Sequence, residues 1–407
     1  FTNRMIRNLL VPVVLEQILN SIMGTADTMM VSNVGSAALS AVSLVDSINV
    51  LLIQAFSALA AGGAIVCAQY IGQKNYERAN MSARQVLFII TAISVAVSAI
   101  CLIFQKPLLR LIFGAVEADV MRASETYFFY TALSFPFIAA YDSAASIFRA
   151  QDNTKGPMLI SMISNVMNIG GNAILIWVFH MGVAGAAIST LVSRIFCAVV
   201  VLYQLRKDRQ PIVVRDYLKI RPDWAMIRRI LGLGIPSGIE NSMFQLGKLA
   251  IQSTVSTLGT AAIAAQAMTN ILENLNGIAA IGVGVGLMTI VGQCLGAGRK
   301  DEAVYYIKKL CVIAEVVIIV SCLTVYALAR PVTILGSMEK TSAAMCIHMV
   351  TWITIVKPLV WTMAFVPGYG LRAAGDVKFS MITSCCTMWA CRFCLCVFLI
   401  RVMGFGP

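Results

Sequence analysis

The chain contains two copies of one sequence pattern, and the second copy follows the first at an offset of 224 positions. Equivalent residues under this offset include Pro12 and Pro236, Glu16 and Glu240, Gly35 and Gly259, Gln69 and Gln293, and Pro107 and Pro331. After a slip of one residue, the pattern continues from 149–155 to 372–378. The duplication predicts two similar helical bundles, an arrangement that is typical of secondary transporters.

The composition excludes an ordinary soluble globular protein, because 59% of the residues are hydrophobic and only 12% are charged. Apolar runs of about 20 residues or more recur along the chain, which is the length a helix needs to cross a bilayer. Unpaired backbone groups are costly in lipid, so these runs predict helices. We expect an all-α polytopic membrane protein with spans near 5–31, 37–71, 85–105, 126–148, 157–180, 183–205, 225–256, 261–295, 307–329, 343–370 and 378–403.

The repeat also predicts the domain organisation. We expect an N-terminal lobe of six helices over 1–205, a basic cytoplasmic linker over 206–224 and a C-terminal lobe over 225–407. Six crossings in each repeat give both lobes one orientation, which predicts a pseudo-two-fold axis along the membrane normal. The second copy stops where the first copy starts its sixth helix, so a twelfth helix is expected to be missing from this sequence.

The formal net charge of +12 orients the chain in a membrane. Lys and Arg are concentrated in the linker and in the loops of one side, whereas few occur in the opposite loops: Lys106, Arg110, Arg122, Arg330 and Lys340. By the positive-inside rule, this asymmetry predicts a multi-pass protein of the inner cell membrane with a cytoplasmic N-terminus. We therefore expect the lipid bilayer as a partner, no nucleic acid, and a monomer.

Several short motifs resemble those of one transporter family. They are TADTMMVS at 25–32 with the following Gly35 and Ala-rich helix, QYIG at 69–72, the two Arg-Ala segments that begin at Arg149 and Arg372, and GVAGAAIST at 182–190. In this order, and over essentially the whole chain, they resemble the MATE multidrug and toxin extruders. The resemblance implies export of organic cations in exchange for protons or sodium ions, by alternating access of two six-helix lobes.

An ionised side chain at the centre of a bilayer costs about 2.5–3.5 kcal/mol on insertion scales, so each one requires an explanation. Asp27 lies deep in the first expected helix. Its carboxylate is suited to bind a proton, Na⁺ or a cationic substrate, and helix capping or packing is the alternative interpretation. Asp27 is therefore the first candidate for a coupling site.

The fifth expected helix adds Asn165, Asn168 and Asn172, of which the last two are four residues apart and share a face. Amide oxygens are suitable ligands for a hard cation, although an asparagine ladder can also hold helices together. The resemblance implies that this helix and Thr190 of the sixth helix join Asp27 in a cation site. It also implies an Asp where this chain has Asn172. Because a carboxylate is lost there, we favour proton coupling, with Na⁺ at Asp27, Asn168 and Asn172 as the alternative.

The second lobe offers substrate-site candidates of both charges. Glu240 and Glu273 are each either a substrate-binding acid or a member of a structural ion pair. Lys248 can pair with Glu240 two turns away or with Glu273 on the next helix. Two amides complete the candidate set, Gln266 and Asn270.

Pro12 and Pro236 lie in early turns of equivalent helices. Each proline removes a backbone hydrogen bond and permits bending, so both are candidate hinges.

The expected function is that of a cation-coupled antiporter that exports small cationic amphiphiles. The alternative is a lipid-linked oligosaccharide flippase of the same superfamily, whose members tend to have cationic cavities. An enzyme is not expected, because the sequence lacks HExxH, GxSxG and phosphate-binding Gly-Lys motifs. No cofactor is expected; the coupling ion is H⁺, with Na⁺ as its alternative.

Overall fold

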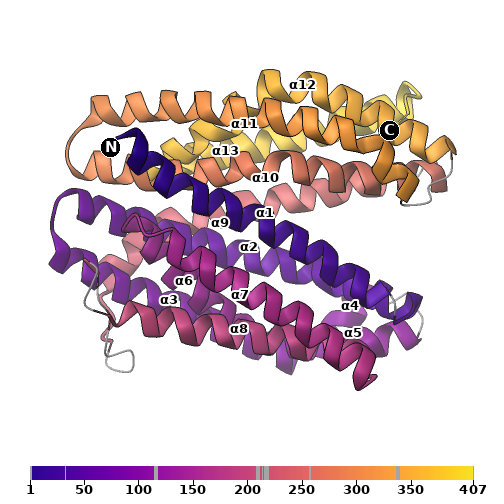
Figure 1. Cartoon of the computed structure of the whole chain (residues 1–407), viewed down its shortest axis with the longest axis horizontal. Helices are drawn as coiled ribbons and strands as arrows, with labels where there is room; N and C mark the ends of the chain where they lie inside the picture. The colour runs from indigo at the N-terminus through magenta and orange to yellow at the C-terminus, as the bar shows by residue number, and fades with distance from the viewer. Residues whose placement is uncertain are drawn as a thin grey trace. The chain divides into compact units, whose positions relative to one another are not determined.

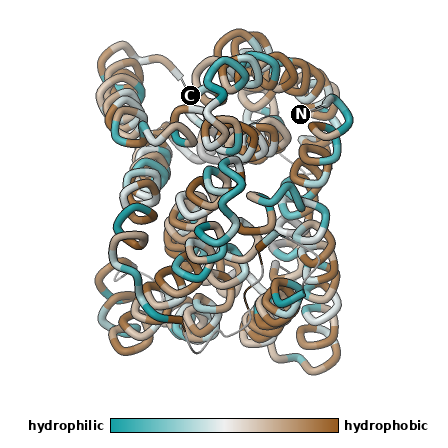
Figure 2. The backbone as a smooth tube through the Cα atoms, turned by 90° about the vertical axis from the view of Figure 1, so that its left-hand side faces the viewer, coloured by the Kyte–Doolittle hydropathy of each residue, from teal (hydrophilic) through white to brown (hydrophobic). Residues whose placement is uncertain are grey.

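The computed structural model describes residues 2–32, 34–113, 118–207, 211–212, 214, 220–255, 258–335 and 340–406. Within these ranges the regular structure is helical, as Figure 1 shows, and nine helices are long and apolar enough to cross a membrane. Hydrophobic residues dominate most of the helices (Figure 2). The predicted all-α polytopic architecture is thereby confirmed.

The first compact unit contains Phe1–Pro12 and Leu19–Gly238. Within it, α2 packs against α3, α5 and α6, and α7 packs against α8 (Figure 1). A large hydrophobic core runs between these helices and includes Phe56, Phe128 and Ile147. The helices of this unit are α1 (Asn3–Ser32) apart from Val13–Ile18, α2 (Ser36–Gly72), α3 (Tyr76–Ile103), α4 (Gln105–Phe113), α5 (Ala118–Leu133), α6 (Phe135–Ala150), α7 (Lys155–Asn172), the π-helix η1 (Ala173–Val178), α8 (Val183–Leu205) and the start of α9 (Trp224–Val255).

The second compact unit contains Val13–Ile18 and Ile239–Pro407. Helix α10 packs against α11 and α12, with small hydrophobic cores such as the one around Leu272 and Val350. Its helices are the end of α9, α10 (Thr260–Gly296), α11 (Lys300–Leu335), α12 (Lys340–Ala373), α13 (Val377–Cys386), the π-helix η4 (Thr387–Phe393), α14 (Cys394–Val397) and the π-helix η5 (Phe398–Val402). The predicted linker over 206–224 lies partly outside the described residues.

Helices α2 and α10 show the repeat most directly. Each is 37 residues long, and their bounds differ by the offset found in the sequence. Each follows a glycine with positive φ, 148° at Gly35 and 107° at Gly259, a conformation that residues with a Cβ rarely adopt. The duplicated sequence therefore produces the same helix and the same preceding turn in both copies.

The predicted single span over 126–148 is instead two helices, α5 and α6, separated at Ser134. Pro136 follows in the first turn of α6, and it has no backbone N–H to continue the hydrogen bonds of α5. The Ser134 hydroxyl donates to the Thr131 carbonyl at 2.6 Å. The proline therefore explains why this apolar run is interrupted.

Gly62 and Gly63 are adjacent glycines inside α2. Helix α2 runs unbroken through both glycines. A Cβ added to Gly62 would lie 2.7 Å from the backbone nitrogen of Gly234 in α9, and one added to Gly63 would overlap Val86 of α3. These glycines therefore serve the close approach of neighbouring helices.

Pro12 and Pro236 both lie inside continuous helices, α1 and α9. Pro12 cannot donate to the carbonyl of Asn8, and the Thr154 hydroxyl is 3.4 Å from that oxygen and 2.8 Å from the Leu9 carbonyl. A neighbouring segment thus supplies a donor where the proline removes one. Bending at either proline stays a prediction.

Candidate functional site

Helices α1 and α7 bring Asp27 and Asn172 into contact. The Nδ2 group of Asn172 donates a hydrogen bond to Oδ1 of Asp27. Asn172 is fully buried and Asp27 is half-buried. Among the residues that the structure describes, none donates to the Oδ1 atom of Asn172. The contact therefore places a carboxylate beside a buried amide with one spare acceptor.

The α-helical part of α7 ends at Asn172, and the π-helix η1 begins at the next residue. A π-helical turn shifts the faces on which later side chains lie, and such turns occur frequently at functional sites. The span over 157–180 was predicted as one regular helix, because nothing in its apolar pattern distinguishes a π-helical turn from an α-helical one. The irregular backbone starts directly at the amide that contacts Asp27.

The other candidate residues of the first lobe form hydrogen bonds with groups other than Asp27. Asn165 donates to Oδ1 of Asn20 in α1 at 2.6 Å. Asn168 accepts from the Ser189 hydroxyl of α8, at 3.0 Å through its side chain and 2.8 Å through its carbonyl. Thr190 donates to the Ala186 carbonyl of its own helix at 3.1 Å. Asn165 and Asn168 therefore link helices as a polar ladder does, and Asn172 is the member that meets Asp27.

A wider electrostatic group surrounds Asp27 in the first unit. Asp46 and Arg194 both interact with it electrostatically, and Asp142 interacts with Arg194. The Tyr127 hydroxyl donates to Asp46 at 3.0 Å, and Arg194 donates to the Ser134 hydroxyl at 2.5 Å. This group contains three carboxylates and one guanidinium.

The sequence analysis missed Arg194. The signal that could have found it is a single charged residue within the apolar run 183–205, because a charge inside a membrane helix is a site candidate by default. Its guanidinium lies next to the interruption between α5 and α6, through its bond to Ser134.

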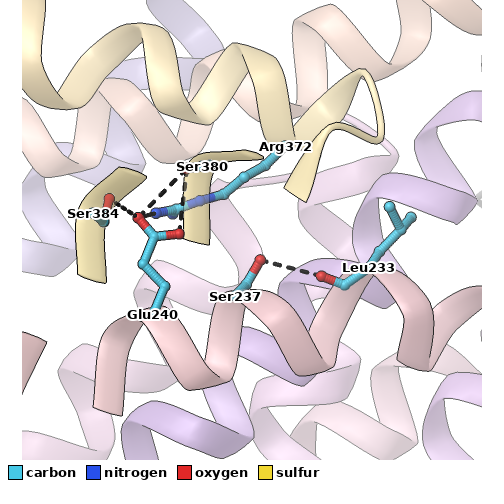
Figure 3. Close-up of polar contacts among 6 residues, drawn as sticks. All are labelled: Leu233, Ser237, Glu240, Arg372, Ser380 and Ser384. Carbon is cyan, nitrogen blue, oxygen red and sulfur yellow. Dashed lines mark hydrogen bonds and ion pairs between the residues drawn. The ribbon is translucent and has the colours of Figure 1, made fainter. Parts of the chain in front are cut away.

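In the second unit, Glu240 of α9 forms a buried ion pair with Arg372 of α12 (Figure 3). Arg372 Nη2 lies 2.7 Å from Glu240 Oε1, and the two side chains are 16% and 9% exposed. The hydroxyl groups of Ser384 and Ser380 in α13 donate to the same carboxylate at 2.7 Å and 3.3 Å. Of the two interpretations of Glu240, the structure therefore supports the structural ion pair. Glu240 pairs with Arg372, and Lys248 interacts electrostatically with Glu273, the second of the two partners that the sequence offered.

Lys248 instead lies over an aromatic ring. Its Nζ atom is 4.8 Å from the ring centroid of Phe244, and Arg392 of η4 lies 5.8 Å from the same ring. Lys248 also interacts electrostatically with Glu273 and with Arg392. A cation within about 6 Å of a ring centroid is attracted by the π-electrons. Phe244 therefore has two cationic side chains within about 6 Å of its ring.

Lys357 of α12 lies in the same electrostatic group. Only 7% of the residue is exposed, its Nζ atom donates to the Glu273 carbonyl at 3.4 Å, and it lies 5.6 Å from the Trp361 ring. It interacts electrostatically with Glu273 and Lys248. We call the set of Phe244, Lys248, Lys357, Trp361, Phe365 and Arg392 the basic-aromatic cluster.

Gln266 and Asn270 are four residues apart on α10, and the Nε2 group of Gln266 donates to Oδ1 of Asn270 at 3.4 Å. Glu273 follows one turn later on the same helix. These amides therefore pair with one another along the helix that carries Glu273.

Comparison with known protein families detects the same repeat that the sequence offset shows. The family model MatE matches residues 12–174 and again 236–398, two ranges separated by the sequence offset. Probable multidrug resistance protein YoeA of Bacillus subtilis (strain 168) is 26% identical over 389 residues, covering 93% of this chain and 83% of the relative. Uncharacterized transporter YisQ of the same organism is 24% identical over 401 residues, covering 97% and 87%.

The fold also has solved counterparts. An outward-facing multidrug resistance MATE family transporter of the MOP superfamily superimposes with a TM-score of 0.93 at 18% identity, covering 99% of this chain and 89% of that chain. At this identity the likeness establishes the fold alone.

Proposed function

Because the chain belongs to the MatE family, we propose that it is an ion-coupled antiporter that exports small organic molecules, with the Asp27 carboxylate as its coupling group. Members of this family are membrane-embedded transporters and not enzymes. The relative YoeA is named a multidrug resistance protein, which supports an organic substrate. The expected monomer, inner-membrane location and cytoplasmic N-terminus are part of the proposal.

The contact between Asp27 and Asn172 is the observation that carries the proposal. An ionised carboxylate only accepts hydrogen bonds, whereas a protonated one must also donate. Asn172 can serve both states, because its NH₂ group donates to the carboxylate and its oxygen can accept from the acid after the amide rotates. A proton on Asp27 would therefore reverse one buried hydrogen bond between α1 and α7, which gives the coupling ion a local structural effect.

The surroundings of Asp27 favour a proton over Na⁺. Na⁺ is a hard cation and prefers several oxygen ligands. Asn172 brings no second carboxylate to the contact with Asp27, and Asn168 already accepts from Ser189. Asp46, the other carboxylate that interacts with Asp27, already accepts from Tyr127, and the nearby Arg194 stays positively charged. A proton needs only one acceptor and tolerates this environment better.

Alternating access would connect proton binding with export. A proton and a cationic substrate that compete for Asp27 would bind in different steps of the cycle, which is the minimum condition for antiport. A membrane potential of about 150 mV supplies roughly 3.5 kcal/mol per charge. This energy supports a concentration ratio of a few hundred, since about 1.4 kcal/mol corresponds to a factor of ten.

The test uses purified protein in liposomes that contain a fluorescent organic cation. A proton gradient and a sodium gradient are imposed separately at constant membrane potential. We expect efflux that follows the proton gradient and ignores the sodium gradient. Efflux that follows Na⁺ at constant pH would reverse the choice of coupling ion.

A further inference from the structure

We propose that the basic-aromatic cluster binds the anionic group of an aromatic substrate. The inference rests on the proposed transport function, because it names the chemical class of the molecule carried. It also qualifies the expectation of purely cationic amphiphiles, since the predicted ligand has a carboxylate, sulfonate or phosphate attached to a ring system.

The charge balance of the cluster is the first argument. Lys248 interacts electrostatically with Glu273, Arg392 and Lys357, and Lys357 also interacts with Glu273. Glu240, the acid of α9, is neutralised by Arg372. In the part of the chain that the structure describes, none of the three cations has a carboxylate oxygen within 4.0 Å. Lys248 and Lys357 thus share Glu273 at a distance beyond that of an ion pair, and Arg392 adds a third positive charge beside Lys248.

An excess of positive charge within membrane helices indicates a missing anionic partner. Ionisable residues within membrane helices are costly, face the protein interior or a water-filled cavity, and usually pair with an opposite charge. Lys357 is almost fully buried and has a carbonyl oxygen and a ring as its neighbours. An anion between Lys248 and Arg392 would supply the missing negative charge, with charge-assisted hydrogen bonds from both.

The aromatic residues supply the second half of the site. Trp361 and Phe365 are stacked, with centroids 5.0 Å apart and an interplanar angle of 28°, and Phe365 meets Phe244 edge to face at 6.0 Å. Aromatic side chains offer large, rigid apolar faces on which another ring can stack. Cations beside a row of rings match a ligand that joins a negative group to an aromatic system.

The repeat shows that these residues are not part of the shared scaffold. Under the offset of 224, Phe244 corresponds to Asn20 and Lys248 to Gly24. In the first unit, Asn20 accepts hydrogen bonds from Ser161 and Asn165, and the charged group there is mainly acidic. The second copy has a ring and a cation at the equivalent positions. The two copies therefore present opposite electrostatic character.

The test compares two ligands that differ in one charge. A fluorescent rhodamine with a free carboxylate and its methyl ester have the same ring system, but only the former has an anionic group. Binding to the purified full chain in a neutral detergent is followed by fluorescence anisotropy, without any ion gradient. We expect the free acid to bind about ten-fold more tightly than the ester, the order of one charge-assisted contact.

Substitutions then locate the preference. Lys248→Gln and Arg392→Gln should each remove most of the preference for the acid and leave the binding of the ester unchanged. Lys248→Arg should keep the preference, which controls for misfolding, and the exposed Lys340→Gln controls for general loss of charge. Equal binding of acid and ester by the unsubstituted chain would overturn the proposal, as would a preference that survives both glutamine substitutions.

Failure of this inference can be distinguished from failure of the proposed function. Ligand preference is measured at equilibrium, whereas coupling through Asp27 is measured as gradient-driven efflux. The Asp27→Asn variant should keep the preference for the acid. Loss of the preference in that variant would contradict a site located in the second unit.

Discussion

The guanidinium of Arg372 lies 2.7 Å from the carboxylate of Glu240 and joins α12 to α9 inside the second unit. Ser380 and Ser384 complete the bonding of the same carboxylate. A buried ion pair with several hydrogen bonds is costly to break, because one charge is left without a partner. The pair is therefore a structural element of the second unit.

Glu240→Gln should lower the free energy of unfolding by about 3–5 kcal/mol, since Arg372 would stay charged in a buried position. The measurement is thermal or denaturant unfolding of the purified protein in detergent. Glu302→Gln is the control, because Glu302 forms an exposed ion pair with Arg299 at 2.9 Å, which contributes about 0–1 kcal/mol. Equal effects of the two substitutions would show that the Glu240 pair is not structural.

Thr154→Val should destabilise the chain by about 1 kcal/mol, because the carbonyl groups of Asn8 and Leu9 lose a donor. Pro12→Ala restores a backbone N–H to α1, so the cost of Thr154→Val should be smaller in that background. The double-mutant cycle, measured by unfolding, gives the coupling directly. Strictly additive effects would mean that Thr154 does not compensate for the proline.

Gly62→Ala should reduce the stability or the yield of folded protein, because the new methyl group would lie 2.7 Å from the backbone of Gly234. A backbone atom cannot move aside as a flexible side chain can, so the expected cost is roughly 1–3 kcal/mol. Gly232→Ala in α9 is the control, since no heavy atom lies within 4 Å of its added Cβ. The control should be neutral or stabilising, and the reverse order of the two would contradict the close approach of α2 and α9.

Asn172→Asp should introduce a response to sodium. The substitution places a second carboxylate beside Asp27, which increases the negative charge available to Na⁺. We expect that efflux in liposomes at constant pH becomes stimulated by a sodium gradient. Asn165→Asp adds the same charge on the same helix, where Asn165 bonds to Asn20, and should not produce this response. A variant at Asn172 that remains insensitive to Na⁺ would contradict our reason for favouring protons.

The fold class, the repeat and the family could be predicted from the sequence. Long apolar runs, and glycines and prolines that recur at a fixed offset, are recognisable without knowing which helices contact one another. The first and last residues of α2 and α10 are equivalent under the sequence offset. Interruptions were harder to predict. Pro136 was a visible signal for the separation of α5 from α6, whereas the π-helix after Asn172 leaves no trace in composition.

The candidate site was predicted in part. Asp27 and Asn172 could be named because polar groups in lipid are conspicuous, and the family resemblance implied that they lie together. The structure joins them by a hydrogen bond. The partners of Asn165, Asn168 and Glu240 could not be named, since side-chain pairing depends on how helices rotate against one another. Asn168 meets Ser189, and Glu240 meets Arg372 rather than Lys248.

Proton-driven efflux by Asp27→Asn in liposomes tests the coupling proposal most directly. Asparagine keeps the size of the side chain but has no group that binds a proton in the working range of pH. We predict that the variant inserts and unfolds like the unsubstituted chain yet shows no efflux in response to a proton gradient, while the exposed Asp301→Asn control transports normally. Normal proton-driven efflux by Asp27→Asn would contradict the account.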